Sequence, residues 1–209
     1  MTRISSPATS SKHASERGRP REFDIDEVVR SAGRVFWEHG YHATSIEELC
    51  KATGLLRGSL YGAFGDKRGV LIAALDRYAD GAVARLKERL EADLPPSEAL
   101  RQGLLYYTRV ASELSGRHGC FITNAVLELL PAEEELRPHI EAALQRLAAQ
   151  FAAAVVRGQK AGKFNPTLDE QSVGQFLLCM VQGLRVLGKV DVKEAQLVAV
   201  VEMTMRALL

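Results

Sequence analysis

Residues 44–67, TSIEELCKATGLLRGSLYGAFGDK, contain the most informative pattern of the sequence. Thr44 and Glu47 have the spacing of a capping box, which predicts the start of a short helix. Gly54 supplies the left-handed residue that ends such a helix, and a second short helix is expected over 57–63. Two short helices joined by a tight glycine turn predict a helix-turn-helix, whose second helix enters the major groove of DNA.

The rest of the chain repeats apolar side chains with the 3.6-residue spacing of helices, and no stretch alternates with period two. The sequence therefore predicts an all-α protein of about nine helices. Asp24 is expected to begin the first helix and Gly40 to end it. The later helices are expected over about 68–92, 97–115, 120–130, 132–161, 167–188 and 192–208. Pro138 allows the helix over 132–161 to begin as late as Arg137.

The chain divides into three parts by composition and helix pattern. Residues 1–21 form a basic arm rich in Ser, Thr, Pro and Gly, which we expect to be disordered when free. Residues 22–67 form the three-helix DNA-binding domain, and residues 68–209 form a larger helical domain. The helix over 68–92 links the two.

Composition and missing motifs exclude several functional classes. A net charge of +1 over 209 residues argues against indiscriminate coating of nucleic acid. Three cysteines without a CxxC spacing predict neither a zinc site nor a disulfide framework. Without an apolar signal core or a run of about 20 apolar residues, we expect a cytoplasmic protein with no membrane partner. Without a phosphate loop, GxSxG or HExxH motif, we expect no enzyme, metal site or cofactor.

The helix-turn-helix residues Gly54-Leu55, Arg57-Gly58-Ser59-Leu60-Tyr61, Phe64 and Lys67 resemble the DNA-binding end of TetR-family transcriptional regulators. The resemblance is specific over about residues 23–80 and only architectural beyond. It implies a bacterial homodimeric repressor that binds a near-palindromic operator and is released by a small molecule in its C-terminal domain. Two features depart from the family pattern. Leu56 stands where a capping Ser or Thr is usual, and Gly62-Ala63 replaces bulkier residues.

The recognition helix places Arg57 and Ser59 at the base edges, with Gly58 allowing close approach and Tyr61 further along. Arg57 suits either guanine or a phosphate. The resemblance implies phosphate contacts by Thr44, Tyr61 and Lys67, although Thr44 also suits a helix cap alone and Tyr61 a partly buried core position. In the arm, Arg17-Gly18-Arg19-Pro20 is AT-hook-like and suits either a narrow minor groove or a solvated tail. The candidate DNA-binding residues are Arg17, Arg19, Arg21, Thr44, Arg57, Gly58, Ser59, Tyr61 and Lys67.

The resemblance implies an effector cavity between the C-terminal helices. Its candidate wall mixes aromatic, soft apolar and polar side chains, as ligand pockets do, although the same residues would suit an ordinary core. The candidates are Tyr107, Cys120, Phe121, Asn124, Phe151, Phe176, Met180 and Gln182.

The helices over 167–188 and 192–208 are apolar on more than one side, which predicts a two-fold four-helix dimer contact or, alternatively, tight internal packing. Two other functions remain open. Cys120 at a helix start suits a redox- or electrophile-sensing repressor, although it also suits inert packing. The departures at Leu56 and Gly62 suit a helical binding or scaffold protein with a vestigial DNA-binding head. Cys50 and Cys179 are expected to be buried, and the acidic run 133–135 to be solvated.

Overall fold

A computed structural model of the chain describes residues 23–190 and 192–209. Nine α-helices and three short 3-10 helices make up this part, without a strand, which confirms the all-α prediction. Their bounds are α1 Ile25–His39, α2 Ile46–Thr53, α3 Arg57–Phe64, α4 Lys67–Leu90, α5 Pro96–Ser112, η1 Leu114–His118, α6 Phe121–Leu129, η2 Glu134–Leu136, α7 Arg137–Lys160, α8 Glu170–Leu187, η3 Gly188–Val190 and α9 Glu194–Ala207.

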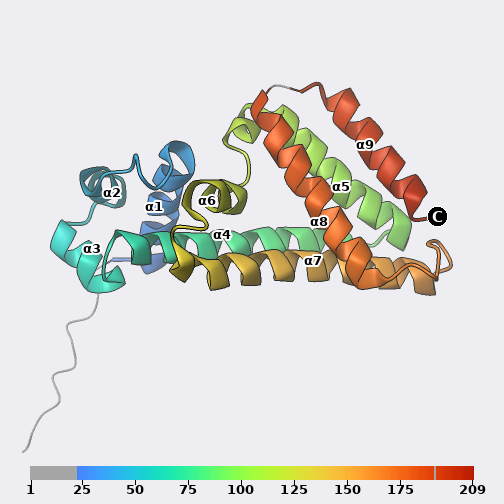
Figure 1. Cartoon of the computed structure of the whole chain (residues 1–209), viewed down its shortest axis with the longest axis horizontal. Helices are drawn as coiled ribbons and strands as arrows, with labels where there is room; N and C mark the ends of the chain where they lie inside the picture. The colour runs from blue at the N-terminus through green and yellow to red at the C-terminus, as the bar shows by residue number, and fades with distance from the viewer. Residues whose placement is uncertain (1–22, 191) are drawn as a thin grey trace, which may run out of the picture.

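The long helices α4 and α7 run side by side along the molecule (Figure 1). Helices α1 to α3 form a head at one end of α4, whereas α5, α8 and α9 gather around its other end. Helix α6 lies between the two groups. Helix α4 therefore joins the head to the C-terminal bundle.

The start of α2 differs from the prediction by one residue. Ser45, not Thr44, is the N-cap: its hydroxyl accepts from the Glu48 amide at 3.2 Å, and the Glu48 carboxylate accepts from the Ser45 amide at 2.7 Å. Thr44 is instead 1% exposed and donates its hydroxyl to the Gly40 carbonyl. The sequence shows two overlapping capping-box patterns, and burial of the Thr44 side chain selects the second.

The acidic run before α7 is not simply solvated, as the sequence suggested. Glu133 and Glu135 both form ion pairs with Arg68 in the first turn of α4, the Glu133 pair at 3.0 Å. Helix α7 begins only at Arg137, after the short 3-10 turn Glu134–Leu136, which is the later of the two starts that the sequence allowed. Pro138 then occupies the first turn, where its missing amide costs no hydrogen bond.

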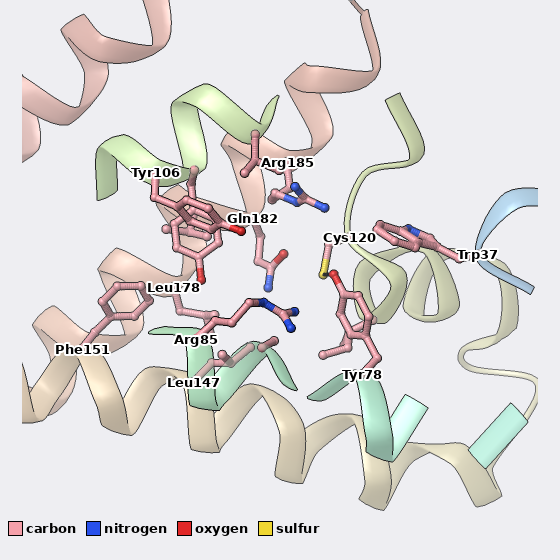
Figure 2. A pocket seen from close by; sticks show the side chains of 15 residues that line it. Trp37, Tyr78, Arg85, Tyr106, Cys120, Leu147, Phe151, Leu178, Gln182 and Arg185 are labelled. Atoms are coloured by element: carbon pink, nitrogen blue, oxygen red, sulfur yellow. Dashed lines mark hydrogen bonds between the residues drawn. The ribbon is translucent and has the colours of Figure 1, made fainter. Parts of the chain in front are cut away.

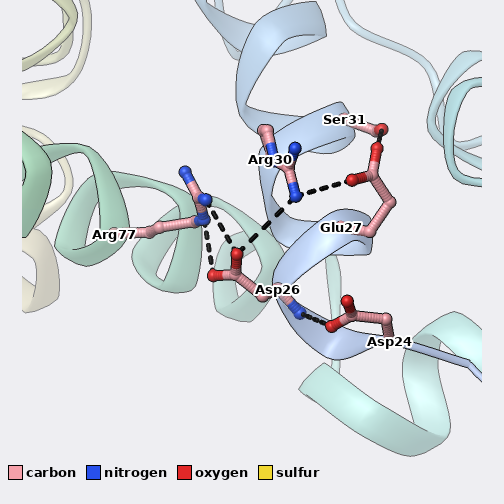
Figure 3. Close-up of polar contacts among 6 residues, drawn as sticks. All are labelled: Asp24, Asp26, Glu27, Arg30, Ser31 and Arg77. Atoms are coloured by element: carbon pink, nitrogen blue, oxygen red, sulfur yellow. Dashed lines mark hydrogen bonds and ion pairs between the residues drawn. The ribbon is translucent and has the colours of Figure 1, made fainter.

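Helix α1 is fixed to α4 by a bidentate ion pair (Figure 3). Arg77 donates to the two carboxylate oxygens of Asp26, from Nε at 2.7 Å and from Nη2 at 2.8 Å. Arg30 also approaches Asp26, at 3.7 Å, and pairs more closely with Glu27 at 2.6 Å. The parallel fork geometry orients the two helices as well as attracting them.

We expect the Asp26–Arg77 pair to contribute stability in a pH-dependent way. The hydrogen bond from Arg77 lowers the pKa of Asp26 in the folded protein below its usual value of 3.8. A lowered folded pKa gives stability that is present above the unfolded pKa and is lost as pH falls through the folded pKa. Asp26→Asn should therefore lower the unfolding temperature at neutral pH, with the difference from wild type shrinking below about pH 4. An unchanged difference in acid would assign the effect to packing instead of charge.

Helix α8 is more apolar than the sequence analysis allowed. The stretch Glu170–Val190 is long and apolar enough to cross a membrane by length and composition alone, with a mean hydropathy of 1.3. It is also a core helix that packs along α7, a position that demands the same composition. Cys179 on this helix is exposed and Cys50 half-buried, so the expectation that both are buried was wrong for Cys179.

Candidate nucleic-acid interface and ligand cavity

The N-terminal half of α3 is open to solvent. Arg57, Gly58 and Ser59 are all exposed, whereas Leu60 is fully buried and anchors the helix to the head. The guanidinium carbon of Arg57 lies 5.3 Å from the centre of the Tyr61 ring, within the range of a cation–π contact. This contact holds the Arg57 side chain beside the helix, where it is available to a base or a phosphate.

The cap of α3 carries no polar side chain. Leu56 occupies the N-cap without a side-chain hydrogen bond and is 81% exposed. Helices of this kind usually begin with a hydroxyl or a carboxylate, so the first amides of α3 remain open to another acceptor. A DNA phosphate is such an acceptor.

Lys67 is the first residue of α4, and Asp66 caps that helix by accepting from the Gly69 amide at 2.8 Å. The Lys67 ammonium lies 4.4 Å from the centre of the Tyr41 ring, which in turn stacks on Phe36. The charge is thus held near a helix N-terminus on the head, as a phosphate contact requires.

Two sets of predicted DNA-binding residues differ in position from the exposed start of α3. The Thr44 side chain is buried and bonded to Gly40, so in this conformation its hydroxyl does not reach a phosphate. Arg17, Arg19 and Arg21 lie outside the described residues.

A cavity of about 290 Å³ lies between the head and the C-terminal helices (Figure 2). Four of the predicted wall residues line it: Tyr107, Cys120, Phe151 and Gln182. The other lining residues are Trp37, Tyr78, Ala82, Arg85, Tyr106, Val110, Ile122, Leu147, Leu178, Val181 and Arg185. Helices α4, α5, α7 and α8 therefore all contribute walls, and Trp37 brings α1 of the head into the site.

The other four predicted wall residues lie elsewhere. Phe121 packs edge-on against Tyr78 and lines a neighbouring groove beside α1. Asn124 accepts from the Lys189 ammonium at 2.9 Å and donates to the His118 carbonyl at 2.8 Å. Phe176 is 47% exposed, and Met180 is half-buried outside the lining. Helical spacing alone did not separate the cavity side of α8 from its opposite side.

The polar half of the cavity was not predicted from the sequence. Trp37, Tyr78, Arg85 and Arg185 were not among the predicted wall residues. Arg185 falls among the apolar residues of α8 and is only 7% exposed. A charged residue inside an otherwise apolar helix was the available signal, because such residues are rarely buried without a partner.

Cys120 is buried at the N-cap of α6, and the Tyr78 hydroxyl lies 3.9 Å from its sulfur. Burial raises the pKa of Tyr78, so this hydroxyl stays protonated and is the donor in that contact. In the part of the chain that the structure describes, no group of three His, Cys, Asp or Glu residues is arranged to hold a metal ion.

Helix α6 connects the cavity to the head. Its start, at Cys120 and Ile122, lines the cavity. Near its other end, the Glu128 carboxylate accepts from the backbone amides of Tyr41 at 3.0 Å and His42 at 2.8 Å. These two amides belong to the turn between α1 and α2. Helix α6 therefore contacts the chain directly before the helix-turn-helix.

Replacing Glu128 by alanine should loosen this turn. With the carboxylate gone, the Tyr41 and His42 amides lose their acceptor and should exchange with solvent faster in a hydrogen–deuterium measurement. Glu141→Ala, which removes an exposed carboxylate from α7, is the matched control and should leave both amides unchanged. Unaltered exchange in Glu128→Ala would mean that α6 does not restrain the head.

Known protein families match both the head and the C-terminal helices of this chain. The family model for bacterial regulatory proteins of the tetR family matches residues 28–74, and that for the tetracyclin repressor-like C-terminal domain matches residues 96–203. The HTH-type transcriptional repressor ComR of Escherichia coli (strain K12) is 30% identical over 196 residues, which are 91% of this chain and 91% of ComR. The HTH-type transcriptional regulator YezE of Bacillus subtilis (strain 168) is 32% identical over 148 residues, 71% of this chain and 76% of YezE.

A solved structure shows the same fold on DNA. The TetR-family regulator CifR, as a cysteine mutant in complex with a 26-base-pair operator, superimposes with a TM-score of 0.79 at 29% identity, covering 92% of this chain and 100% of that one. Such relatives are DNA-binding regulators and not enzymes. With one family model covering more than half of its length and ComR aligned over nearly all of it, the chain belongs to the TetR family of bacterial transcriptional regulators.

Proposed function

We propose that the protein is a homodimeric repressor that binds a near-palindromic operator and is released by a small molecule in the cavity. The observation that carries this proposal is the position of the cavity. Its wall includes Trp37 of the head and Tyr78 and Arg85 of the connecting helix α4, together with the C-terminal helices. A ligand there contacts both functional parts at once. As a DNA-bound bacterial regulator, the protein acts in the cytoplasm.

On DNA, the exposed start of α3 enters the major groove, with Arg57 and Ser59 at the base edges. Gly58 between them has open space around its α-carbon, which allows the backbone to come close to the DNA. Tyr61 and Lys67 contact phosphates on either side. Arg17, Arg19 and Arg21 of the arm add contacts in the adjacent minor groove.

The dimer forms through α8 and α9. Exposed apolar side chains on these two helices are Phe176, Val186, Leu187, Val200 and Met203. Exposed apolar side chains on neighbouring elements are typical of an interface, and two helices from each subunit give a four-helix contact. Two-fold symmetry then places the recognition helices in successive major grooves, about 34–36 Å apart.

Release follows from a change in the position of the head. A ligand between α4, α6 and Trp37 favours the arrangement that fits it best, and the Glu128 contact and α4 transmit this preference to α2 and α3. Operator affinity falls when the favoured arrangement has the wrong spacing between the two heads. The ligand shifts the equilibrium only by its difference in affinity for the two states.

The test is a gel-shift titration of the purified protein on DNA from its own promoter region. We expect a shift that is sequence-dependent and weakens with salt, since phosphate contacts release counterions. Failure to retard this DNA, or to select any site from a random-sequence library, would contradict the proposal. That outcome would support a helical scaffold protein with a vestigial DNA-binding head.

A second candidate uses the thiol of Cys120 as the sensor. Cys120 lines the cavity, so an oxidant or electrophile that enters meets its sulfur beside the Tyr78 hydroxyl. Reaction there would displace the start of α6 and, through Glu128, the head. Peroxide should then release the wild-type protein from DNA but not Cys120→Ser. An equal response of the two proteins would dismiss this candidate.

A further inference from the structure

The polar groups around the cavity are almost all hydrogen-bond donors. Its lining contains two arginines, a glutamine and three tyrosines, but no aspartate or glutamate. Figure 2 shows the side chains of Arg85, Gln182 and Arg185 directed toward the same space, with the Tyr78 hydroxyl opposite. A site built from donors is complementary to a ligand that brings acceptors.

Arg185 is the centre of this set. Its side chain is buried in the molecule, with 7% of its surface exposed, and its Nη2 donates to the Gly119 carbonyl. Within residues 23–190 and 192–209 it forms no ion pair with a carboxylate. A guanidinium has five N–H donors, so one carbonyl leaves most of them unused. A buried charge without a counter-charge is costly, and an anion in the cavity removes that cost.

The neighbouring groups are also fixed as donors. The Gln182 side-chain oxygen accepts from the Thr123 hydroxyl at 2.8 Å, which leaves its amide nitrogen for the cavity. Burial raises the pKa of Tyr107 to about 12, and it raises the pKa of Tyr78 as well. Both hydroxyls therefore remain protonated at any physiological pH. The Tyr107 hydroxyl can donate to an anion, and the Tyr78 hydroxyl can do so by turning away from the Cys120 sulfur, which is a weak acceptor.

The opposite side of the cavity is apolar. Leu147 and Phe151 of α7 and Leu178 of α8 form this side, and each of them is buried. A volume of about 290 Å³ is at the small end of ligand pockets. The space thus suits a compact molecule with one charged end and an apolar body.

We infer that the effector is a small organic acid whose carboxylate binds the guanidinium of Arg185, with Gln182 and the two tyrosine hydroxyls as further donors. Its apolar body lies against Phe151 and the leucines. Arginine and carboxylate match in planar, two-bond geometry, which gives the site a preference for acids over neutral molecules of the same shape. This inference rests on the proposed function, since it names the ligand class of the cavity proposed to control DNA binding.

The experiment compares matched probes that differ only in the head group. One set is phenylacetate, phenylacetamide and phenethylamine, and the other is hexanoate, hexanamide and hexylamine. Trp37 is the only tryptophan of the chain and lines the cavity, so its fluorescence reports occupancy directly. We expect the carboxylates to change the fluorescence and to raise the unfolding temperature, and the amides and amines to bind at least about tenfold more weakly.

Variants at Arg185 separate charge from shape. Arg185→Gln should weaken carboxylate binding by roughly tenfold or more, which is the effect of one lost charged contact. Arg185→Lys keeps the charge without the planar fork and should fall between Arg185→Gln and wild type. Arg109→Gln removes an exposed arginine of α5 that does not line the cavity, and it should bind as wild type does. Circular dichroism checks that each variant is folded. If a variant does not fold, the inference is still tested by comparing how tightly the wild-type protein binds the different probes.

Amides that bind as tightly as the acids, full carboxylate affinity in folded Arg185→Gln, or no carboxylate binding to the wild type would each overturn the inference. None of these results alters the gel shift without ligand, so DNA binding is judged separately. Binding of amides or amines that also releases DNA would leave the proposed regulator in place with a different ligand class.

Discussion

Arg57→Ala should weaken binding to the specific operator far more than binding to unrelated DNA. A bidentate arginine–guanine contact contributes about 1–3 kcal/mol of discrimination, and a dimer carries two copies. The expected loss is therefore about 2–6 kcal/mol for the specific complex. The Tyr61 ring, which holds the Arg57 guanidinium at 5.3 Å, favours this role because an ordered side chain loses less entropy on binding.

Lys67→Ala provides the contrast on the same head. Its ammonium lies at the start of α4, where a phosphate contact carries no sequence information. This variant should weaken binding about equally on all sequences and reduce the salt dependence by about one ion per head. Affinity measured on operator and non-operator DNA over a series of salt concentrations distinguishes a base contact from a phosphate contact. Equal losses on both DNAs for Arg57→Ala would make Arg57 a phosphate contact.

Gly183→Glu should abolish the dimer while leaving the subunit folded. Gly183 lies on the exposed side of α8 with Phe176 and Leu187, and a β-carbon there meets no atom of its own chain within 4 Å. Replacing a helical glycine also raises the helix propensity, so the subunit itself should not be destabilised. In the proposed dimer, however, each new carboxylate would lie inside the apolar contact between the two subunits.

Loss of the dimer removes the advantage of binding two half-sites together. Operator affinity should fall by about 10²–10⁴, the range over which linked sites exceed single ones. Sedimentation measures the oligomeric state, and the gel shift measures the affinity. Gln145→Glu, which adds the same charge to an exposed position of α7, should remain dimeric and bind DNA normally. A dimeric Gly183→Glu protein would place the interface elsewhere.

The helix-turn-helix was predictable because its signals are local. Gly54 has φ of 70°, which favours glycine, and Leu60 shows the burial that its spacing predicts. The capping residue was misplaced because Thr44 and Ser45 offer the same chemistry, and only burial against Gly40 separates them. The local sequence pattern therefore predicted the helix-turn-helix, whereas tertiary packing determined which of two neighbouring residues, Thr44 or Ser45, caps α2.

The cavity was only half predictable. Tyr107, Cys120, Phe151 and Gln182 were identified as side chains of the right kind, but Phe176 had the same character and points outward. The positions of Trp37 and Tyr78 in the wall depend on how α1 meets α4. That contact depends on the packing of the head and on the ion pair between Asp26 and Arg77. These two residues are 51 positions apart in the chain.

The helices, the DNA-reading element and the family could all be predicted from the sequence, because caps, glycine turns and apolar periodicity act within a few residues. The tertiary structure alone decided that Thr44 is buried, that Glu128 holds the α1–α2 turn, and that Arg185 has its charge inside a cavity of donors. Each of these depends on residues distant in the chain, since the burial and charge environment of a side chain are properties of everything packed around it.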